Sequence, residues 1–156
     1  MNSSVGRIRT VLTLVAGLCA GVFPVSARAQ AGVKQVVTVP GAAANAMLSA
    51  GIRVGNLLFM SGQLGGSDST TEGQTKQSLD NMKKVLDAAG TTVDNVVKCT
   101  VFLIDMKDFS KMNEAYRTFF ATNGAKDMPG RSTVAVAGLA RPSAKIEIEC
   151  IAVMPK

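Results

Sequence analysis

Two charged residues in the last third of the chain have types and surroundings suited to chemistry. Arg131 lies in the segment Pro-Gly-Arg-Ser-Thr at 129–133, and Glu147 lies in the strand-like run 145–153. An arginine fork binds a small carboxylate through two parallel hydrogen bonds, and a half-buried glutamate can take a proton from water. The sequence has no histidine, so it lacks the usual general base and a common metal ligand. We expect a catalytic centre to contain Arg131 and Glu147, with Glu149 as a rival for the role of Glu147.

Strands and helices that hydrophobic periodicity predicts must position these residues. The expected strands are 34–39, 52–54, 57–61, 96–104, 134–136 and 145–153, with a hairpin turn at Gly55-Asn56. One expected helix begins near Thr70 or Thr71 and ends at Gly90. A second is expected from about Asp108, as its cap, to Phe120. The Gly-rich segment 62–73 is expected to be a polar loop.

The order of these elements predicts an α+β fold, a single sheet with two helices packed on one face. Along the last strand, alternate residues from Ile146 to Ala152 form one apolar face. The opposite face carries Ile151 and Val153 beside the two glutamates. Because two helices cover only one face, we expect a second subunit to cover the other.

The first 29 residues have the pattern of a secretory signal peptide. A basic start precedes an apolar run at 11–22, and Ala27-Arg28-Ala29 is a small-x-small cleavage site. The run of 12 residues is shorter than the roughly 20 that a membrane-spanning helix needs. The arginines of the basic start are not adjacent, which favours the general export route over the twin-arginine route. We expect residues 1–29 to be removed and 30–156 to form one domain, in the periplasm or secreted.

Charge and cysteine content bear on the remaining chain. Three of the 17 basic side chains lie in the leader, which leaves 14 against 11 acidic ones. This mild basicity, with one tyrosine and no tryptophan, argues against nucleic-acid binding. An oxidising compartment would permit a disulfide between Cys99 and Cys150. Because each lies in an apolar strand-like run, the sequence favours two separate buried thiols, without deciding the question.

A series of short motifs runs from about Ile52 to the C-terminus. They include Val54-Gly55-Asn56, Ser61-Gly62-Gln63, Ser78-Leu79-Asp80-Asn81, Asp105-Met106-Lys107-Asp108-Phe109, Asn113-Glu114-Ala115-Tyr116, Pro129-Gly130-Arg131-Ser132 and Glu147-Ile148-Glu149. Together these motifs resemble the RidA family of reactive-intermediate imine deaminases. The resemblance implies a chorismate-mutase-like fold, a homotrimer with active sites in the clefts between subunits, and no cofactor or metal.

The resemblance also implies roles for individual residues. The carboxylate-binding arginine of the family corresponds to Arg131, which backbone groups near Thr133 would assist. The glutamate that handles water corresponds to Glu147. Asn113 and Gly62 correspond to positions that line the cleft.

One position departs from the family pattern. The main active subgroup carries a tyrosine seven residues before the Gly of Val-Gly-Asn, and an ungapped count from Gly55 gives Leu48. Leucine has no hydroxyl to bind water or the substrate nitrogen, and it leaves more space than a phenol. We therefore expect weak activity on 2-iminopropanoate and relatively better activity on bulkier, more apolar imines.

The expected function is hydrolysis of 2-imino acids to 2-ketoacids and ammonia. Arg131 would bind the substrate carboxylate, and Glu147 would orient or deprotonate the attacking water. Leu48 keeps open a second class, a non-catalytic binder of small carboxylates or a holdase-like stress protein of the periplasm. A third class, an endoribonuclease of the same family, is the weakest, because the chain lacks histidine and a clear basic patch and carries an export signal.

Overall fold

A computed structural model of the chain describes residues 32–42 and 47–155. The expected signal peptide and its cleavage site lie outside the described residues. None of the helices in the described part is long and apolar enough to cross a membrane. The described residues all belong to one compact unit.

The unit is built on one mixed sheet. Its strands are β1 (Gln35–Val37), β2 (Gly51–Val54), β3 (Leu57–Met60), β4 (Gln63–Leu64), β5 (Val96–Leu103), β6 (Gly130–Ala135) and β7 (Ile146–Val153). They are arranged in the order β1-β2-β3-β7-β5-β6, and the short β4 also pairs with β7. β5 and β6 run parallel, whereas the other described pairs are antiparallel. β7 thus lies at the centre, paired with β3, β4 and β5.

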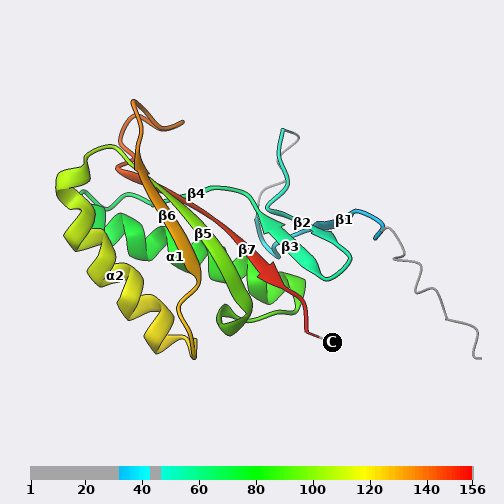
Figure 1. Ribbon diagram of the computed structural model, residues 1–156. Coiled ribbons are helices and arrows are strands. Elements are labelled where there is room, and N and C mark those ends of the chain that lie inside the picture. The colour runs from blue at the N-terminus through cyan, green and yellow to red at the C-terminus, as the bar shows by residue number, and fades with distance from the viewer. Residues whose placement is uncertain (1–31, 43–46, 156) are drawn as a thin grey trace, which may run out of the picture. The chain divides into compact units, whose positions relative to one another are not determined.

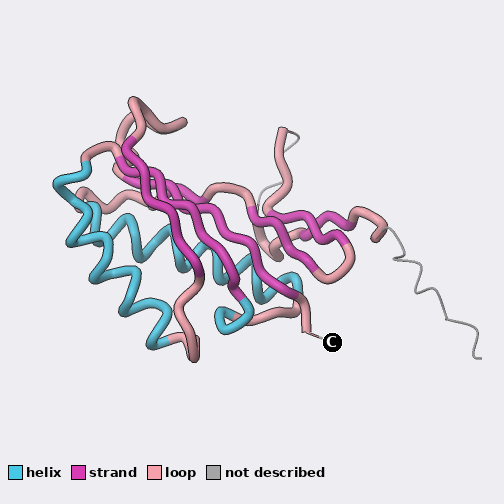
Figure 2. The backbone as a smooth tube through the Cα atoms, in the orientation of Figure 1, coloured by secondary structure: helices cyan, strands magenta, loops and turns pink. Residues whose placement is uncertain are grey.

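Two helices, α1 (Thr71–Ala89) and α2 (Phe109–Thr122), lie on the same side of the sheet (Figures 1 and 2). Two short 3-10 helices, η1 (Val93–Asn95) and η2 (Met106–Asp108), precede β5 and α2. The Thr70 hydroxyl accepts a hydrogen bond from the Gly73 N–H at 3.0 Å and so caps α1. Gly90 ends α1 at φ 78°, a left-handed conformation that glycine adopts without strain. The predicted α+β fold, with two helices on one face of a single sheet, is confirmed.

Two local predictions were wrong, and a third was confirmed only in position. The expected loop 62–73 contains β4, which is too short to show periodicity in the sequence. Asp108 occupies the cap position of α2, but its carboxylate accepts from the Thr71 hydroxyl and makes no capping bond. Finally, β6 begins at Gly130, so that Arg131 lies inside the strand, not ahead of it.

The two faces of the sheet differ in their burial, as the strand pattern predicts. Alternate residues of β7, Ile146, Ile148, Cys150 and Ala152, are buried under the helices. The intervening apolar residues, Ile151 and Val153, are only half-buried and have no described element over them. Phe59 and Val134 on the same outer face are each 43% exposed. This face keeps apolar surface that a soluble monomer usually covers.

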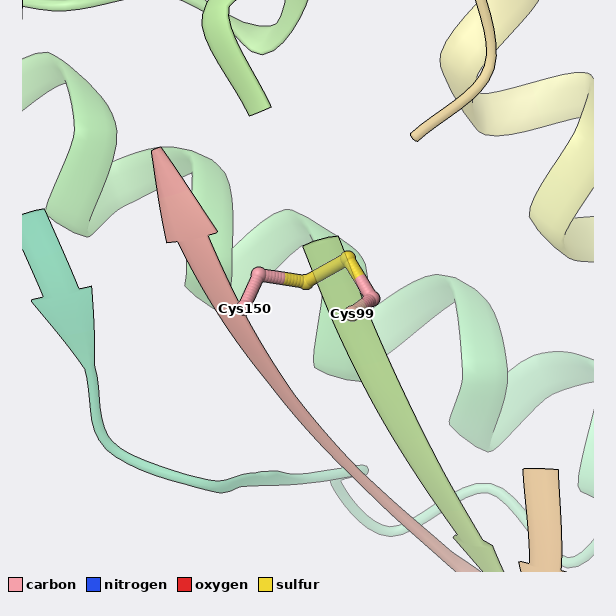
Figure 3. The surroundings of a disulfide bond; sticks show 2 residues. All are labelled: Cys99 and Cys150. Atoms are coloured by element: carbon pink, nitrogen blue, oxygen red, sulfur yellow. A yellow bond between two sulfur atoms is a disulfide. The ribbon is translucent and has the colours of Figure 1, made fainter. Parts of the chain in front are cut away.

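A disulfide joins Cys99 of β5 to Cys150 of β7 (Figure 3), with an S–S distance of 2.01 Å. The expectation of two separate thiols was therefore wrong. The two cysteines are direct partners across an antiparallel pair, both facing the helices. Opposite residues in such a pair have Cβ atoms about 4.5–5.5 Å apart or closer, which brings their sulfur atoms within reach. Each of the two cysteines is thus both buried in the core and bonded to the other.

Candidate functional site

Arg131 projects from β6 toward α2 and is held there by neutral groups. Its Nη2 donates to the Asn113 side-chain oxygen at 2.5 Å, and Nη1 lies 3.8 Å from the Met112 sulfur. The guanidinium carbon is 4.7 Å from the centre of the Tyr116 ring and 5.8 Å from that of Phe109. These contacts fix the plane of the guanidinium without neutralising its charge.

A cavity of about 380 Å³ opens beside Arg131. It is lined by Asn113, Tyr116, Arg117, Met128, Pro129 and Arg131. The Tyr116 hydroxyl is buried and has no hydrogen-bond partner among the described residues. Burial raises the pKa of the Tyr116 phenol, and the nearby Arg131 charge only partly opposes this shift, so the phenol is neutral at physiological pH. The cavity therefore combines positive charge with neutral hydrogen-bonding groups.

Thr133 lies two residues beyond Arg131 on β6 and so points to the same face of the sheet. Its hydroxyl oxygen is buried and has no hydrogen-bond partner among the described residues. Together with Arg131 and Asn113, it makes up what we call the arginine half-site. Buried polar atoms of this kind usually have a partner, although Thr133 does not itself line the cavity beside Arg131.

Glu147 lies on β7, half-buried, with Gly62 directly against its carboxylate. A Cβ atom built on Gly62 would overlap the Glu147 carboxylate oxygen Oε1. A larger residue at position 62 would therefore require the Glu147 side chain to move from this position. β4 and β5 support Glu147 from both sides, because Leu64 and Phe102 are its direct partners in the sheet.

Leu48 lines a second cavity, of about 470 Å³, together with Gly62, Gln63 and residues of β1. The residue is 57% exposed. Ser61 fixes the segment after Leu48: its hydroxyl donates to the Ser49 carbonyl at 2.6 Å, and its N–H donates to the Ala50 carbonyl at 3.0 Å. Leu48, Gly62 and Glu147 make up what we call the glutamate half-site.

The two half-sites lie on opposite faces of the sheet. Arg131 is the partner of Cys99, which is buried under the helices. Glu147 is the partner of Phe102, three residues along β5, so it faces the other way. A single copy of the chain therefore does not bring Arg131 and Glu147 together. An active site containing both must use two copies.

Glu149 is less suited than Glu147 to the role of orienting or deprotonating water. It shares the outer face with Glu147 but is exposed, and it lines a small hollow of about 160 Å³ with Lys98 and Thr100. Neither Gly62 nor Leu48 lines this hollow. The structure thus places Glu147, and not Glu149, against the glycine singled out in the sequence.

Sequence reasoning missed two features of the arginine half-site. Phe109, Met112 and Tyr116 belong to the apolar stripe of α2, but they also form the surface on which Arg131 rests. Arg117 was not considered, although it follows Asn113 by four residues and so shares its helix face. That spacing was the available signal. Within the described part of the chain, no three His, Cys, Asp or Glu side chains gather as a metal site would require.

Comparison with known proteins identifies the family. The profile of the family described as Endoribonuclease L-PSP matches residues 38–154. A protein of Escherichia coli named 2-iminobutanoate/2-iminopropanoate deaminase is 43% identical over 109 residues, which are 66% of this chain and 84% of that protein.

Solved structures agree with this assignment. The crystal structure of the YjgF gene product from E. coli has a TM-score of 0.71 and 38% identity, and covers 78% of this chain and 99% of that one. The structure of E. coli TdcF with bound serine has a TM-score of 0.69 and 35% identity, again over 78% and 99%. The chain belongs to the Endoribonuclease L-PSP family, the family of YjgF and of the RidA deaminases.

Proposed function

We propose that the protein hydrolyses 2-imino acids to 2-ketoacids and ammonia, at sites formed between subunits. The observation that carries the proposal is the guanidinium of Arg131, which is fixed in a cavity by neutral contacts and has no carboxylate partner among the described residues. Such a group is ready to bind a substrate carboxylate through two hydrogen bonds. The names of the deaminase relatives and the serine bound to TdcF agree with a ligand of amino-acid size and charge.

The chemistry needs only water and proton transfer. With its carboxylate on Arg131, the substrate presents its C=N carbon to a water molecule held by Glu147. Glu147 takes a proton as the water oxygen bonds to this carbon, which gives a tetrahedral carbinolamine. Glu147 returns this proton to the nitrogen, which becomes an amine. The carbinolamine hydroxyl then gives its own proton, through Glu147, to the nitrogen. As the C–N bond breaks, ammonia leaves and the carbon becomes the carbonyl of the 2-ketoacid. No electrons are transferred.

The assembly we propose is a homotrimer. In a ring of three copies, the arginine half-site of one subunit meets the glutamate half-site of the next, which places Arg131 and Glu147 in one cleft. The apolar outer face, with Phe59, Val134, Ile151 and Val153, supplies surface that the neighbouring subunits can bury.

The protein also has the features of an exported one, and we propose that it functions in the periplasm or outside the cell. Its first 29 residues have a signal-peptide pattern. The Cys99–Cys150 disulfide agrees with an oxidising compartment, since disulfides are rare in cytosolic proteins. The two features are independent of each other.

One observation favours a second function. Leu48 presents only apolar atoms to the cavity that it lines, at the position where the resemblance to the RidA family implies a tyrosine hydroxyl. If that hydroxyl is indispensable, the clefts would bind small carboxylates without turnover. The protein would then be a binding protein, and assays of turnover and of ketoacid binding separate the two functions.

The first prediction concerns turnover. Wild-type protein should release 2-oxobutanoate from freshly generated 2-iminobutanoate, and Arg131→Lys should lose most of this activity. Lysine keeps the charge but not the planar fork, and a lost charge-assisted hydrogen bond costs about 1.5–3 kcal/mol, or about 10- to 150-fold in kcat/KM. Arg53→Lys, a change of the same type outside both half-sites, is the control. Equal kcat/KM in wild type and Arg131→Lys would remove Arg131 from the site.

The second prediction concerns the shared site. Light scattering should give three times the subunit mass. Arg131→Lys and Glu147→Gln should each be inactive, but heterotrimers purified through two different tags should recover about one third of wild-type activity. In every mixed ring, one of the three interfaces combines intact Arg131 with intact Glu147. Trimers carrying both tags on the same variant are the control. A monomer, or heterotrimers as inactive as their parents, would contradict a site between subunits.

The third prediction concerns Leu48. Leu48→Tyr should raise kcat/KM on 2-iminopropanoate, by about ten-fold or less, because one neutral hydrogen bond contributes about 0.5–1.5 kcal/mol. It should lower kcat/KM on a branched or aromatic imine, because the phenol takes up space. An unchanged substrate ranking would place Leu48 outside the pocket. If neither protein turns over any imine while both bind 2-ketoacids, the protein is a binder.

The fourth prediction concerns export and the disulfide. Protein isolated from the cell envelope should have the intact mass of residues 30–156, and its two cysteines should react with a thiol reagent only after denaturation and reduction. A sample of the same protein that is treated with reductant but not denatured is the control. Its cysteines should stay unreactive, because the disulfide is buried in the folded protein. An N-terminal Met1 on cytoplasmic material with freely reactive thiols would contradict the proposed location.

A further inference from the structure

We propose that Arg117 provides a second anion subsite beside Arg131, so that the preferred ligand is a dicarboxylate, a 2-imino or 2-keto acid whose side chain ends in a carboxylate. The nature of the 2-imino substrate rests on the proposed deaminase function. The charge preference of the cavity rests on the structure of the arginine half-site and can be tested without turnover.

Arg117 lies on the helix face that borders the cavity. Asn113, Tyr116 and Arg117 occupy positions i, i+3 and i+4 of α2 and so lie on one face of the helix. All three line the cavity of about 380 Å³ that also receives Arg131 from β6. Two guanidinium groups from two different elements therefore border one space.

The charge of this space is not neutralised by the protein around it. Arg131 touches an amide, a thioether and two aromatic rings, and none of these carries negative charge. The ion pairs within residues 32–42 and 47–155 are Lys76–Asp80, Lys83–Asp87 and Lys126–Asp94, so neither arginine has a carboxylate partner there. Of the nearest acidic residues in the sequence, Glu114 lines a different groove, between the two helices, and Asp127 is exposed and does not line the cavity.

The size of the cavity suits a small ligand with two charges. Its volume of about 380 Å³ is at the lower end of the range for small-molecule sites, roughly 300–1,000 Å³. One carboxylate on Arg131 uses one of the two positive charges and leaves the other unpaired. A ligand with a second carboxylate, two or three carbons further along, neutralises both charges within the same space.

Leu48 and Arg117 affect different properties of the preferred ligand, its bulk and its charge. The small side chain of Leu48 permits bulk, whereas Arg117 selects negative charge. The decisive comparison is therefore between two ligands of equal bulk and different charge. 2-Oxoglutarate and 5-methyl-2-oxohexanoate form such a pair, because an isopropyl group replaces a carboxylate of nearly the same shape.

The test is calorimetric titration of the full mature protein with these two ketoacids. Wild type should bind 2-oxoglutarate about three- to five-fold more tightly than 5-methyl-2-oxohexanoate, the factor expected for an exposed charge pair. The ratio of the two affinities should fall as salt is added. Arg117→Gln should bring the affinity ratio close to one, whereas Arg117→Lys should retain most of the preference for 2-oxoglutarate. Lys111→Gln removes one positive charge from an exposed position of the same helix outside the cavity, and it should leave the ratio unchanged.

Equal affinities in wild type, a ratio unaffected by Arg117→Gln, or a ratio lowered as much by Lys111→Gln would each overturn the inference. Release of 2-oxobutanoate from 2-iminobutanoate, measured on the same preparations, keeps the two proposals apart. Turnover without a charge preference leaves the deaminase and removes the second subsite. A preference that depends on Arg117 in a protein without turnover leaves the subsite and removes the deaminase.

Discussion

Both half-sites depend on the register of β5 against its two neighbours, because Arg131 of β6 lies opposite Cys99 on the face that the helices cover. Cys99 lies opposite Cys150, and Phe102 lies opposite Glu147. Because side chains alternate along a strand, a slip of one residue would turn Glu147 under the helices and bring Glu149 no closer to Gly62. The disulfide between Cys99 and Cys150 can form in one register only, and so it fixes this arrangement covalently. The position of the glutamate thus follows from a bond on the other face of the sheet.

Arg131 shows how a charge can be half-buried and still be available to a ligand. A guanidinium has five N–H donors. One is used by Asn113, and another points to the soft sulfur of Met112, while the aromatic faces of Tyr116 and Phe109 offset part of the cost of desolvation. The remaining donors and the whole of the positive charge are left for an anion. A carboxylate neighbour would have held the side chain equally well but would have neutralised it.

Long periodic elements were predictable from the sequence, and relations between elements were less so. The helical spacing of apolar residues, Thr70 and Gly90 defined α1 nearly to the residue. The alternation along β7 predicted one buried face and one apolar face without a cover. β4 was missed because two residues carry no period. The disulfide and the separation of Arg131 from Glu147 depend on which residues of β5, β6 and β7 are partners, and spacing within a strand does not specify partners in another. The residues of the candidate site were identified mainly by their resemblance to a family, whereas their distribution over two faces required the register.

The cross-link between Cys99 and Cys150 divides the chain into a closed ring and two tails. The ring, with a sequence separation of 51, contains Asn113, Arg131, Thr133 and Glu147, whereas Leu48 and Gly62 lie on the N-terminal tail. A closed ring has less conformational entropy to lose on folding than a free tail of the same length. The disulfide therefore lowers the entropic cost of ordering the ring that holds Arg131 and Glu147, whereas β1, β2 and β3 lie outside the ring and gain nothing from it.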